Sequence, residues 1–432
     1  MPEPCLPRLL MLTHRFPYPP NRGDRIRSYN LLRLLSQYHR ITLCCPTDEP
    51  VSQSQLDHVN AFCERSVVAP LSKVGRLTHA IRSYANGKSL SEGMFFSSSL
   101  QRQVKSLHAQ TPFQTALVYC SSMFPYVDQP SFRDTRKIVD VVDVDSRKWK
   151  QMSQQSTRLK RWIYGCEAER VQRLEQRIAD RADGIALVSD LEASLFERTV
   201  CVAKSPLGIS NGVDSDFFYP HDAVHRPNAN RKVTKLVFTG VLDYHPNVEG
   251  LVWFCRDLLP QLRQSKPIEL EIVGRRACGK VKDLALLPGV NLVGEVEDVR
   301  PYLHNADIAI SPLKLARGIQ NKVLEAMAAR LPVVLTTESA EGIDATTGVD
   351  FQIADSVEQW RHAILKLSDD AELRTSMGRS ASKLVSQQYS WNARLNKFLT
   401  LTQPASLNGQ TDTDPNPRCD DELSLAVDAG AW

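Results

Sequence analysis

The sequence lacks any apolar run long enough to cross a bilayer. A membrane helix needs about 18 consecutive apolar residues, whereas the longest apolar runs here are short ones such as Leu251–Cys255. Features of a secretory leader are also absent, because the apolar Leu9–Leu12 has no basic region before it and no small-residue cleavage site after it. These absences predict a cytoplasmic protein.

A large excess of charge of one sign is absent too. Lysine and arginine total 53 and aspartate and glutamate total 49, which gives a formal net charge of +4. A chain so nearly balanced is not a polycationic nucleic-acid binder, and we expect no nucleic-acid partner. The hydrophobic share of 42% is typical of a globular protein, and 432 residues are enough for two domains.

Cysteine is present but not in a metal-binding or disulfide pattern. The ten cysteines include no Cys-x-x-Cys pair, and most lie inside apolar segments such as Leu43–Cys45. This scatter predicts reduced core side chains and argues against a zinc site or a disulfide framework.

Short apolar runs alternate with helical patterns along the chain, which predicts parallel β-α-β units. The runs expected to form strands are 8–13, 41–45, 66–69, 116–119, 138–142, 185–188, 236–239, 270–273, 290–293, 308–311, 333–336 and 351–353. Repeated units of this kind form doubly wound α/β domains whose ligands bind at the carboxyl ends of the strands. We therefore expect an α/β protein with two such domains.

Two segments interrupt the alternation. Residues 221–231 are polar, contain a proline and lack periodicity, which predicts a linker between the two domains. Residues 403–432 contain three prolines and six acidic residues against Arg418, which predicts a flexible acidic tail.

The loop after the first expected strand, residues 14–27, contains four arginines and Gly23. A glycine where a strand leads into a helix lets backbone N–H groups approach an anion, and the helix N-terminus favours negative charge. Arg25 and Arg27 add positive charge to the same segment. The alternative is an ordinary surface loop with solvated charges.

Two strand ends in the second half offer the same geometry. Gly240 ends one strand and leads into a helix, and Arg275 follows the end of the next strand. A guanidinium group at a strand's carboxyl end suits a phosphate. The alternative is the tight turn that any β-α unit needs.

A third candidate is the loop that leads into a helix near residue 320. Gly318 precedes this helix, in which Lys322 and Glu325 are three residues apart and share a face. A carboxylate and a cation at a helix start can hold a ribose and a diphosphate. The alternative is a surface ion pair with little effect on stability.

Two further patterns suggest other chemistry. Asp143 and Asp145 have the spacing of an acidic pair that holds a divalent metal, but such doublets are frequent and we expect no metal. Residues 147–161 contain six basic residues and no acid, and Trp162 follows them. This composition suits an anionic membrane surface; a solvated helix face or a loop over the active cleft is the alternative.

Longer segments resemble the family-4 retaining glycosyltransferases, which have the GT-B fold of two facing Rossmann-like domains. The resemblance is carried by SNGVDSDFFYP (210–220), LVFTG (236–240), LEIVGRR (270–276), VNLVGEVEDVRPYLHNADIAISP (290–312) and NKVLEAMAARLPVV (321–334). A closer likeness, to bacterial sugar transferases associated with exosortase/PEP-CTERM exopolysaccharide gene clusters, is carried by RFPYPPNRGDRIRS (15–28), VDVVDVDSRKW (139–149) and FTGVLDYHPN (238–247).

The resemblance implies transfer of a sugar from a nucleotide-sugar donor to an acceptor hydroxyl, with retained configuration and without a metal or other cofactor. It implies a role in exopolysaccharide or other cell-surface glycan biosynthesis, with a glycan or lipid-linked acceptor. The basic residues within 147–161 add the expectation of peripheral attachment to the inner face of the cytoplasmic membrane. The implied organisation is an acceptor-side domain at 1–212, a donor domain at 213–390, a crossover helix at 391–402 and the tail at 403–432.

The resemblance also assigns roles by position. Glu325 matches the glutamate that holds the donor ribose, and we expect Lys322 to act with it in catalysis. The expected donor-binding residues are Gly23, Gly240, Arg275, Gly318, Ile319, Gln320, Asn321, Lys322 and Glu325. The expected acceptor-side residues are Arg25, Arg27, Asp143 and Asp145.

This chain departs from the family pattern at three positions. Arg317 stands where the family has the first glutamate of its Glu-x7-Glu motif, and Asp243 and His245 replace the usual basic pair after the Gly240 strand. Lys322 or Arg275 is expected to substitute for the missing charge. Two alternatives therefore stay open: an enzyme of the nucleotide-sugar 2-epimerase kind on the same fold, or a non-catalytic GT-B scaffold.

Overall fold

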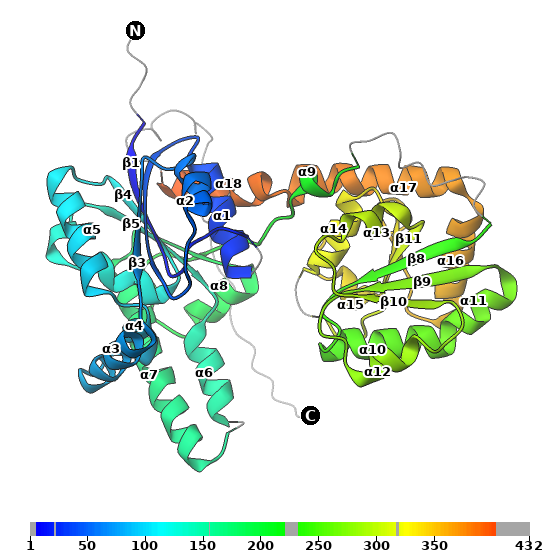
Figure 1. Cartoon of the computed structure of the whole chain (residues 1–432), viewed down its shortest axis with the longest axis horizontal. Helices are drawn as coiled ribbons and strands as arrows, with labels where there is room; N and C mark the ends of the chain where they lie inside the picture. Colours follow the sequence, from blue (N-terminus) through cyan, green and yellow to red (C-terminus); the bar gives the residue numbers. More distant parts are fainter. Residues whose placement is uncertain (1–5, 21–22, 155, 221–231, 317–318, 403–432) are drawn as a thin grey trace, which may run out of the picture. The chain divides into compact units, whose positions relative to one another are not determined.

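The computed structural model describes residues 6–20, 23–154, 156–220, 232–316 and 319–402 (Figure 1). The expected linker at 221–231, the expected tail at 403–432, and Arg317 and Gly318 lie outside these residues. No helix of the described part is both long and apolar enough to cross a membrane.

The first half of the chain forms a parallel sheet in the order β3-β2-β1-β4-β5-β6-β7. Its strands are β1 (Arg8–Thr13), β2 (Arg40–Thr47), β3 (Arg65–Pro70), β4 (Thr115–Tyr119), β5 (Arg136–Val142), β6 (Gly184–Leu187) and β7 (Leu207–Gly208). In the central strand β1, Leu10 pairs with Thr42 on one side and with Ala116 on the other. The strand order reverses between β1 and β4, and doubly wound sheets bind their ligands at such a point.

The second half repeats this topology in a sheet of order β10-β9-β8-β11-β12-β13. Its strands are β8 (Thr234–Thr239), β9 (Ile268–Val273), β10 (Val290–Gly294), β11 (Ile308–Ser311), β12 (Val333–Leu335) and β13 (Gln352–Ile353). All of its strand pairs are parallel, and the order reverses between β8 and β11. The expected class of two doubly wound α/β domains is confirmed. The two-residue β7 has no counterpart among the expected strands, because it is too short to show an apolar run.

The side chains of β1 alternate between two cores, as the period of a strand requires. Leu10 and Leu12 pack with helices α5 (Ser98–Gln110) and α7 (Arg158–Arg181) and with the 3₁₀ turn η1 (Ser121–Tyr126). Leu9 and Met11 pack with α1 (Gly23–Leu35), α2 (Gln53–Asn60) and α18 (Trp391–Thr402). The first sheet is therefore covered on both faces, and the C-terminal helix α18 belongs to its core.

The second sheet is covered in the same way. Leu236 and Phe238 of β8 pack with α10 (His245–Trp253), α11 (Leu259–Ser265), α12 (Gly279–Leu284) and α16 (Val357–Asp369). Val237 faces the other core, with α9 (Ser215–Phe218), α13 (Arg300–Asn305), α14 (Asn321–Ala328) and α17 (Ala371–Leu384). Because both faces are buried, only the ends of the strands can present polar groups to a ligand. Doubly wound sheets bind their ligands at the carboxyl ends.

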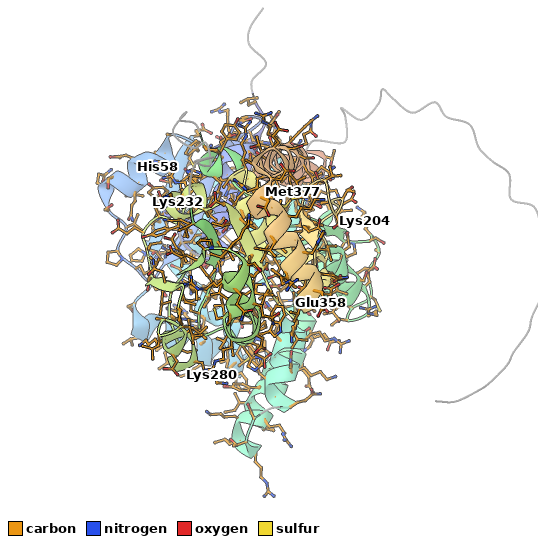
Figure 2. The ribbon with its side chains drawn as sticks, turned by 90° about the vertical axis from the view of Figure 1, so that its right-hand side faces the viewer. His58, Lys204, Lys232, Lys280, Glu358 and Met377 are labelled. Atoms are coloured by element: carbon orange, nitrogen blue, oxygen red, sulfur yellow. The ribbon has the colours of Figure 1, made fainter. Side chains whose placement is uncertain are left out.

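Four further helices belong to the first half of the chain: α3 (Lys73–Ala85), α4 (Leu90–Met94), α6 (Asp145–Gln154) and α8 (Asp190–Glu197). Helices α6 and α7 form an antiparallel pair whose far end, coloured turquoise, extends away from the sheet in both views (Figures 1 and 2).

Candidate functional site

A pocket of about 1030 Å³ opens at the carboxyl ends of the second sheet. It is lined by the loops that follow β8, β9 and β10 and by the start of α14. The pocket brings together Gly240, Arg275, Ile319, Gln320, Asn321, Lys322 and Glu325, all of them expected donor-binding residues.

Two glycines allow the loops of this pocket to meet. A Cβ atom on Gly240 would lie 2.9 Å from the Asn247 amide nitrogen and 3.3 Å from Lys322 Nζ. A Cβ atom on Gly274 would lie 1.7 Å from the carbonyl oxygen of Gly240. Any larger residue at position 274 would push the two loops apart, and a side chain at position 240 would crowd Lys322.

Lys322 is held in place by two neighbours. Its ammonium group donates a hydrogen bond to Asn247 Oδ1 at 2.5 Å and lies 4.5 Å from the centre of the Phe238 ring. Burial lowers the pKa of Lys322 to about 7, while the nearby Glu325 acts in the opposite direction. Burial therefore deprives the ammonium group of water that would stabilise its charge, and the negative charge of an arriving anion would stabilise it instead.

Glu325 lies one turn further along α14 and also lines the pocket. Burial raises its pKa to about 7, and the charge of Lys322 partly offsets this rise. Among the residues that the structure describes, none donates a hydrogen bond to its carboxylate or forms an ion pair with it. An unpartnered carboxylate in a pocket accepts hydroxyl hydrogens from a ligand such as a ribose.

The start of α14 adds backbone donors. Gln320 is the N-cap residue and its side chain makes no capping hydrogen bond. The N–H groups of Asn321 and Lys322, in the first turn, have no helical acceptor, and they carry the positive end of the helix dipole. This is a favourable position for a phosphate group.

The structure also accounts for the acidic residue that follows β8. Asp243 pairs with Arg276 at 2.9 Å, so its charge is already neutralised. Arg275 is exposed, lines the pocket and has no ion-pair partner within the described residues. Arg275 therefore supplies free positive charge at this edge, and Arg276 does not.

Of the lining residues that were not expected from the sequence, four matter for the chemistry of the pocket. Asn247 orients Lys322, and Gly274 permits the contact between the two loops. Glu295 and Glu297, after β10, add acceptors for N–H and O–H groups. Only the glycine after β9 carried a sequence signal, because a glycine at a strand end is a recurrent feature of phosphate-binding loops.

The corresponding edge of the first sheet contains a different group. Gly23 begins α1 and is exposed, and no atom of the described residues beyond its chain neighbours lies within 4 Å of the place that a Cβ atom would take there. His14 follows β1 and lies 3.3 Å from Asp24, and Arg15 lies 3.2 Å from the same carboxylate. These partners lower the pKa of Asp24 to about 2, with the hydrogen bond from His14 as the largest cause. His14 was not among the expected residues.

The structure places Arg25 and Arg27 differently from expectation. Arg25 forms an ion pair with Glu49 at 2.5 Å and is mostly buried. Arg27 is only 1% exposed and binds Asp140 through two nitrogens, at 2.7 and 3.2 Å. The burial of Arg27 does not support contact with an acceptor. Its side chain forms a buried ion pair with Asp140 that ties α1 to β5.

Asp143 and Asp145 lie at the carboxyl end of β5, as the sequence suggests, but they share one cation. Lys148 lies 2.6 Å from Asp143 and 3.6 Å from Asp145. Burial raises the pKa of Asp145. The two carboxylates are therefore partly neutralised by the chain itself.

Comparison with solved structures shows that the fold of two parallel-sheet Rossmann-like domains matches that of GT-B glycosyltransferases. The sucrose-phosphate synthase of Thermosynechococcus elongatus superposes with a TM-score of 0.60 at 16% identity, over 92% of this chain and 98% of that one. HepE of Anabaena in complex with UDP superposes with a TM-score of 0.58 at 12% identity, over 91% and 98%. At these identities the likeness shows the fold.

The sequence of the second domain is similar to a known family. Residues 233–370, which contain the whole pocket, match the family described as glycosyl transferases group 1. Over 395 residues the chain is also 21% identical to an uncharacterized 44.6 kDa protein in the cps region of Klebsiella pneumoniae, covering 88% of this chain and 96% of that protein.

Proposed function

We propose that this protein is a glycosyltransferase that moves a sugar from a nucleotide-sugar donor to an acceptor hydroxyl with retention of configuration. One observation carries the proposal: a carboxylate that no described residue hydrogen-bonds or pairs with, a half-buried lysine and the N-terminal turn of α14 surround the pocket of the second domain. These groups suit a ribose and a diphosphate. The match of residues 233–370 to glycosyl transferases group 1 supports it.

A uridine nucleotide sugar is the donor that we propose first, since HepE is solved with UDP and with UDP-glucose. Glu325 accepts hydrogen bonds from the ribose hydroxyls, and the first turn of α14 faces the diphosphate. Negative charge grows on the diphosphate as the glycosidic bond breaks, and the ammonium group of Lys322 stabilises it most at that moment.

Retention follows if the acceptor hydroxyl approaches on the face from which the diphosphate leaves. The leaving phosphate then takes the proton of that hydroxyl, and Lys322 and Arg275 hold the phosphate in position. Lys322 and Arg275 supply the positive charge that a metal ion supplies in other enzymes, so we propose that no metal is needed. Activity should persist in excess EDTA; loss of activity that manganese restores would contradict this part.

The biosynthetic role is proposed from the relative in the Klebsiella pneumoniae cps region. We assign the protein to exopolysaccharide or other cell-surface glycan synthesis in the cytoplasm. In the proposed domain organisation, residues 1–212 bind a glycan or lipid-linked acceptor, residues 213–390 bind the donor, and residues 391–402 cross back to the first domain.

Peripheral attachment to an anionic membrane is proposed for the far end of the α6–α7 pair. Lys150, Arg158, Lys160 and Arg161 are exposed there, whereas Arg147 is hydrogen-bonded to Thr199 and Lys148 is paired with Asp143. Leu159 and Trp162 are 71% and 61% exposed beside these cations. Apolar side chains among cations favour an anionic lipid surface.

Co-sedimentation with liposomes tests this attachment. Binding to anionic liposomes should fall as salt rises, and the variant K160A/R161A should bind about 30-fold less, because each cation near the surface contributes about 1 kcal/mol. The control K280A/K282A removes two exposed lysines of α12 instead, of which Figure 2 labels Lys280. Equal binding to neutral liposomes, or equal loss in both variants, would refute the assignment.

The activity itself is tested with a panel of nucleotide sugars. We expect release of nucleoside diphosphate from one of them, faster with an acceptor, and a product whose anomeric configuration by NMR matches that of the donor. An inverted product would refute retention. Isomerised donor without acceptor would indicate an epimerase, and absence of both binding and turnover across the panel would indicate a scaffold.

A further inference from the structure

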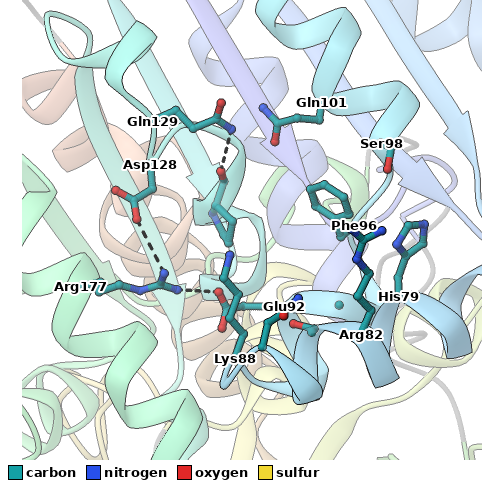
Figure 3. Close-up of a pocket in the computed structure, with 14 residues that line it drawn as sticks. His79, Arg82, Lys88, Glu92, Phe96, Ser98, Gln101, Asp128, Gln129 and Arg177 are labelled. Carbon is teal, nitrogen blue, oxygen red and sulfur yellow. Dashed lines mark hydrogen bonds and ion pairs between the residues drawn. The ribbon is translucent and has the colours of Figure 1, made fainter.

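A second cavity, of about 560 Å³, lies in the first domain (Figure 3). Its walls come from α3, α4, η1, the start of α5 and the later part of α7. It shares no lining residue with the pocket of the second domain, and none with the His14 and Asp24 group at the edge of the first sheet. Its volume is within the roughly 300–1,000 Å³ of small-molecule sites.

One buried amide in this cavity lacks a partner. Gln101 is only 8% exposed, and its Nε2 donates to the carbonyl oxygen of Tyr126 at 3.3 Å. Its Oε1 is buried and accepts no hydrogen bond from any described residue. The Tyr126 carbonyl fixes this orientation, because a reversed amide would bring two oxygens together. A buried acceptor without a donor is costly, so this oxygen favours a ligand that brings an O–H or N–H group.

The free charge in the cavity is positive. Its two acids are already paired: Glu92 lies 2.5 Å from Arg177, and Asp128 lies 2.6 Å from Arg181. Figure 3 shows Arg177 between these two carboxylates. Arg82 and Lys88 are exposed and have no acidic partner in the described part of the chain.

Two more features complete the site. Ser98, the first residue of the 13-residue α5, lines the cavity and places the positive end of the helix dipole beside it. Phe96 lines the same cavity, with its ring stacked on Tyr126 and in edge contact with His79. An aromatic ring there suits the C–H face of a ligand.

We propose that this cavity binds a sugar unit that carries a negative charge. A sugar supplies hydroxyl donors for Gln101 Oε1 and a C–H face for Phe96, and its anionic group faces Arg82 and Lys88. An inorganic anion would satisfy only the two cations, and a neutral sugar would leave them unused. The anionic group can be a carboxylate, as in a uronic acid, or a phosphate ester; both make the same contacts.

Calorimetric titration of the full chain with four probes tests the proposal: methyl glucuronide, glucose 6-phosphate, methyl glucoside and inorganic phosphate. Each titration is repeated with excess UDP, which occupies the donor pocket if the proposed function is correct. We expect one of the two charged sugars to bind, with or without UDP, and to bind at least about 10-fold more tightly than methyl glucoside or phosphate. Which one binds identifies the anionic group.

Variants locate the binding. Gln101→Leu and R82A/K88A should each weaken it about 10-fold, and the latter removes only exposed side chains, so its fold is not at risk. The controls Gln103→Leu and R102A/K105A alter exposed residues of the same helix α5 and should change nothing. E325Q should also change nothing, which separates this cavity from the donor pocket. Absence of binding by both charged sugars, equal binding of phosphate, or binding that neither cavity variant weakens would overturn the proposal.

Discussion

The two sheets have the same topology, yet their carboxyl edges use charge in opposite ways. At the first edge, Asp24 is bound by His14 and Arg15, and Asp143 is bound by Lys148. At the second edge, Lys322 and Glu325 line an open pocket without forming an ion pair with each other.

The two edges also differ in the direction in which the pKa values of their charged groups are shifted. Partners lower the pKa of Asp24 to about 2, whereas burial without a full partner moves the pKa of both Lys322 and Glu325 to about 7. A group whose charge is satisfied by the chain stabilises the fold, and a group that is buried but unsatisfied is prepared for a ligand. The shift of both Lys322 and Glu325 towards their neutral forms therefore supports the proposal that the donor binds at the second edge.

The largest effect is expected from breaking the ion pair inside the first domain. Arg27→Met leaves the buried Asp140 without its cation and should lower the free energy of unfolding by about 3–5 kcal/mol. Chemical denaturation measures this. Arg33→Met, an exposed position on the same helix, should cost under about 1 kcal/mol. The double variant R27M/D140L should recover most of the loss; if it does not, the pair has a role beyond charge compensation.

Removal of the pocket lysine should affect activity strongly and stability little. Lys322→Ala should lower kcat about 100-fold, because the ammonium group acts most when the diphosphate leaves. Asn247→Ala keeps the ammonium group but removes the acceptor that orients it, together with the hydrogen bond from Asn247 Nδ2 to the Val241 carbonyl oxygen, and should cause a smaller fall. Steady-state kinetics measures the fall in kcat, and melting temperatures measured in parallel show whether the variants remain folded. Unchanged kinetics in both variants would remove Lys322 from the site.

The carboxylate should matter for donor affinity. Glu325→Gln keeps the shape but loses charge-assisted hydrogen bonds to the ribose, so Kd for the donor should rise roughly 10- to 100-fold. Glu358→Gln, on α16 outside the pocket, is the matched control (Figure 2). A Kd equal to that of the wild type would show that the carboxylate does not touch the donor.

The smallest expected effect is a proton exchange on binding, of at most about one proton. Above pH 7 the free Lys322 is mostly neutral, and a bound diphosphate raises its pKa, so binding takes up a proton and weakens as pH rises. Below pH 7 the free Glu325 is mostly protonated, and ribose hydroxyls favour its ionised form, so binding releases a proton and weakens as pH falls. UDP affinity should therefore be greatest near pH 7.

Calorimetry in buffers of different ionisation enthalpy counts these protons. The variant K322M should lose the uptake at pH 8 but keep the release at pH 6, and E325Q should do the reverse. If both variants still exchange protons as the wild type does, other groups titrate on binding, and the contrast between the two edges loses its support.

Much of the fold could be predicted from the sequence because its signal is local. The run Arg8–Thr13 is apolar throughout and forms β1 with the same bounds. The spacing of Lys322 and Glu325 along a helix placed both on one face, and the structure shows both in one pocket. Whether these residues perform the expected roles stays a prediction, as do the domain boundaries.

The residues whose surroundings the sequence did not predict make contacts with residues far away in the sequence. Arg27 follows a glycine in an arginine-rich loop, which suggests an anion site, but Asp140 is 113 residues away in the sequence and pairs with it in the core. Asn247 contacts Lys322 across 75 residues, and His14 meets Asp24 only because α1 returns over the end of β1. Local pattern contains no information about such partners.

The sequence alone therefore determined the alternation of strands and helices, the all-parallel class and the residue types at each strand end, because these follow from periodicity and turn chemistry. Tertiary structure alone decided which charges are paired. Free charge depends on the distance between side chains and on burial, and both are set by how β8, β9 and α14 pack together, or α1 and β5 in the first domain. The same residue types thus became a buried ion pair in one domain and the lining of an open pocket in the other.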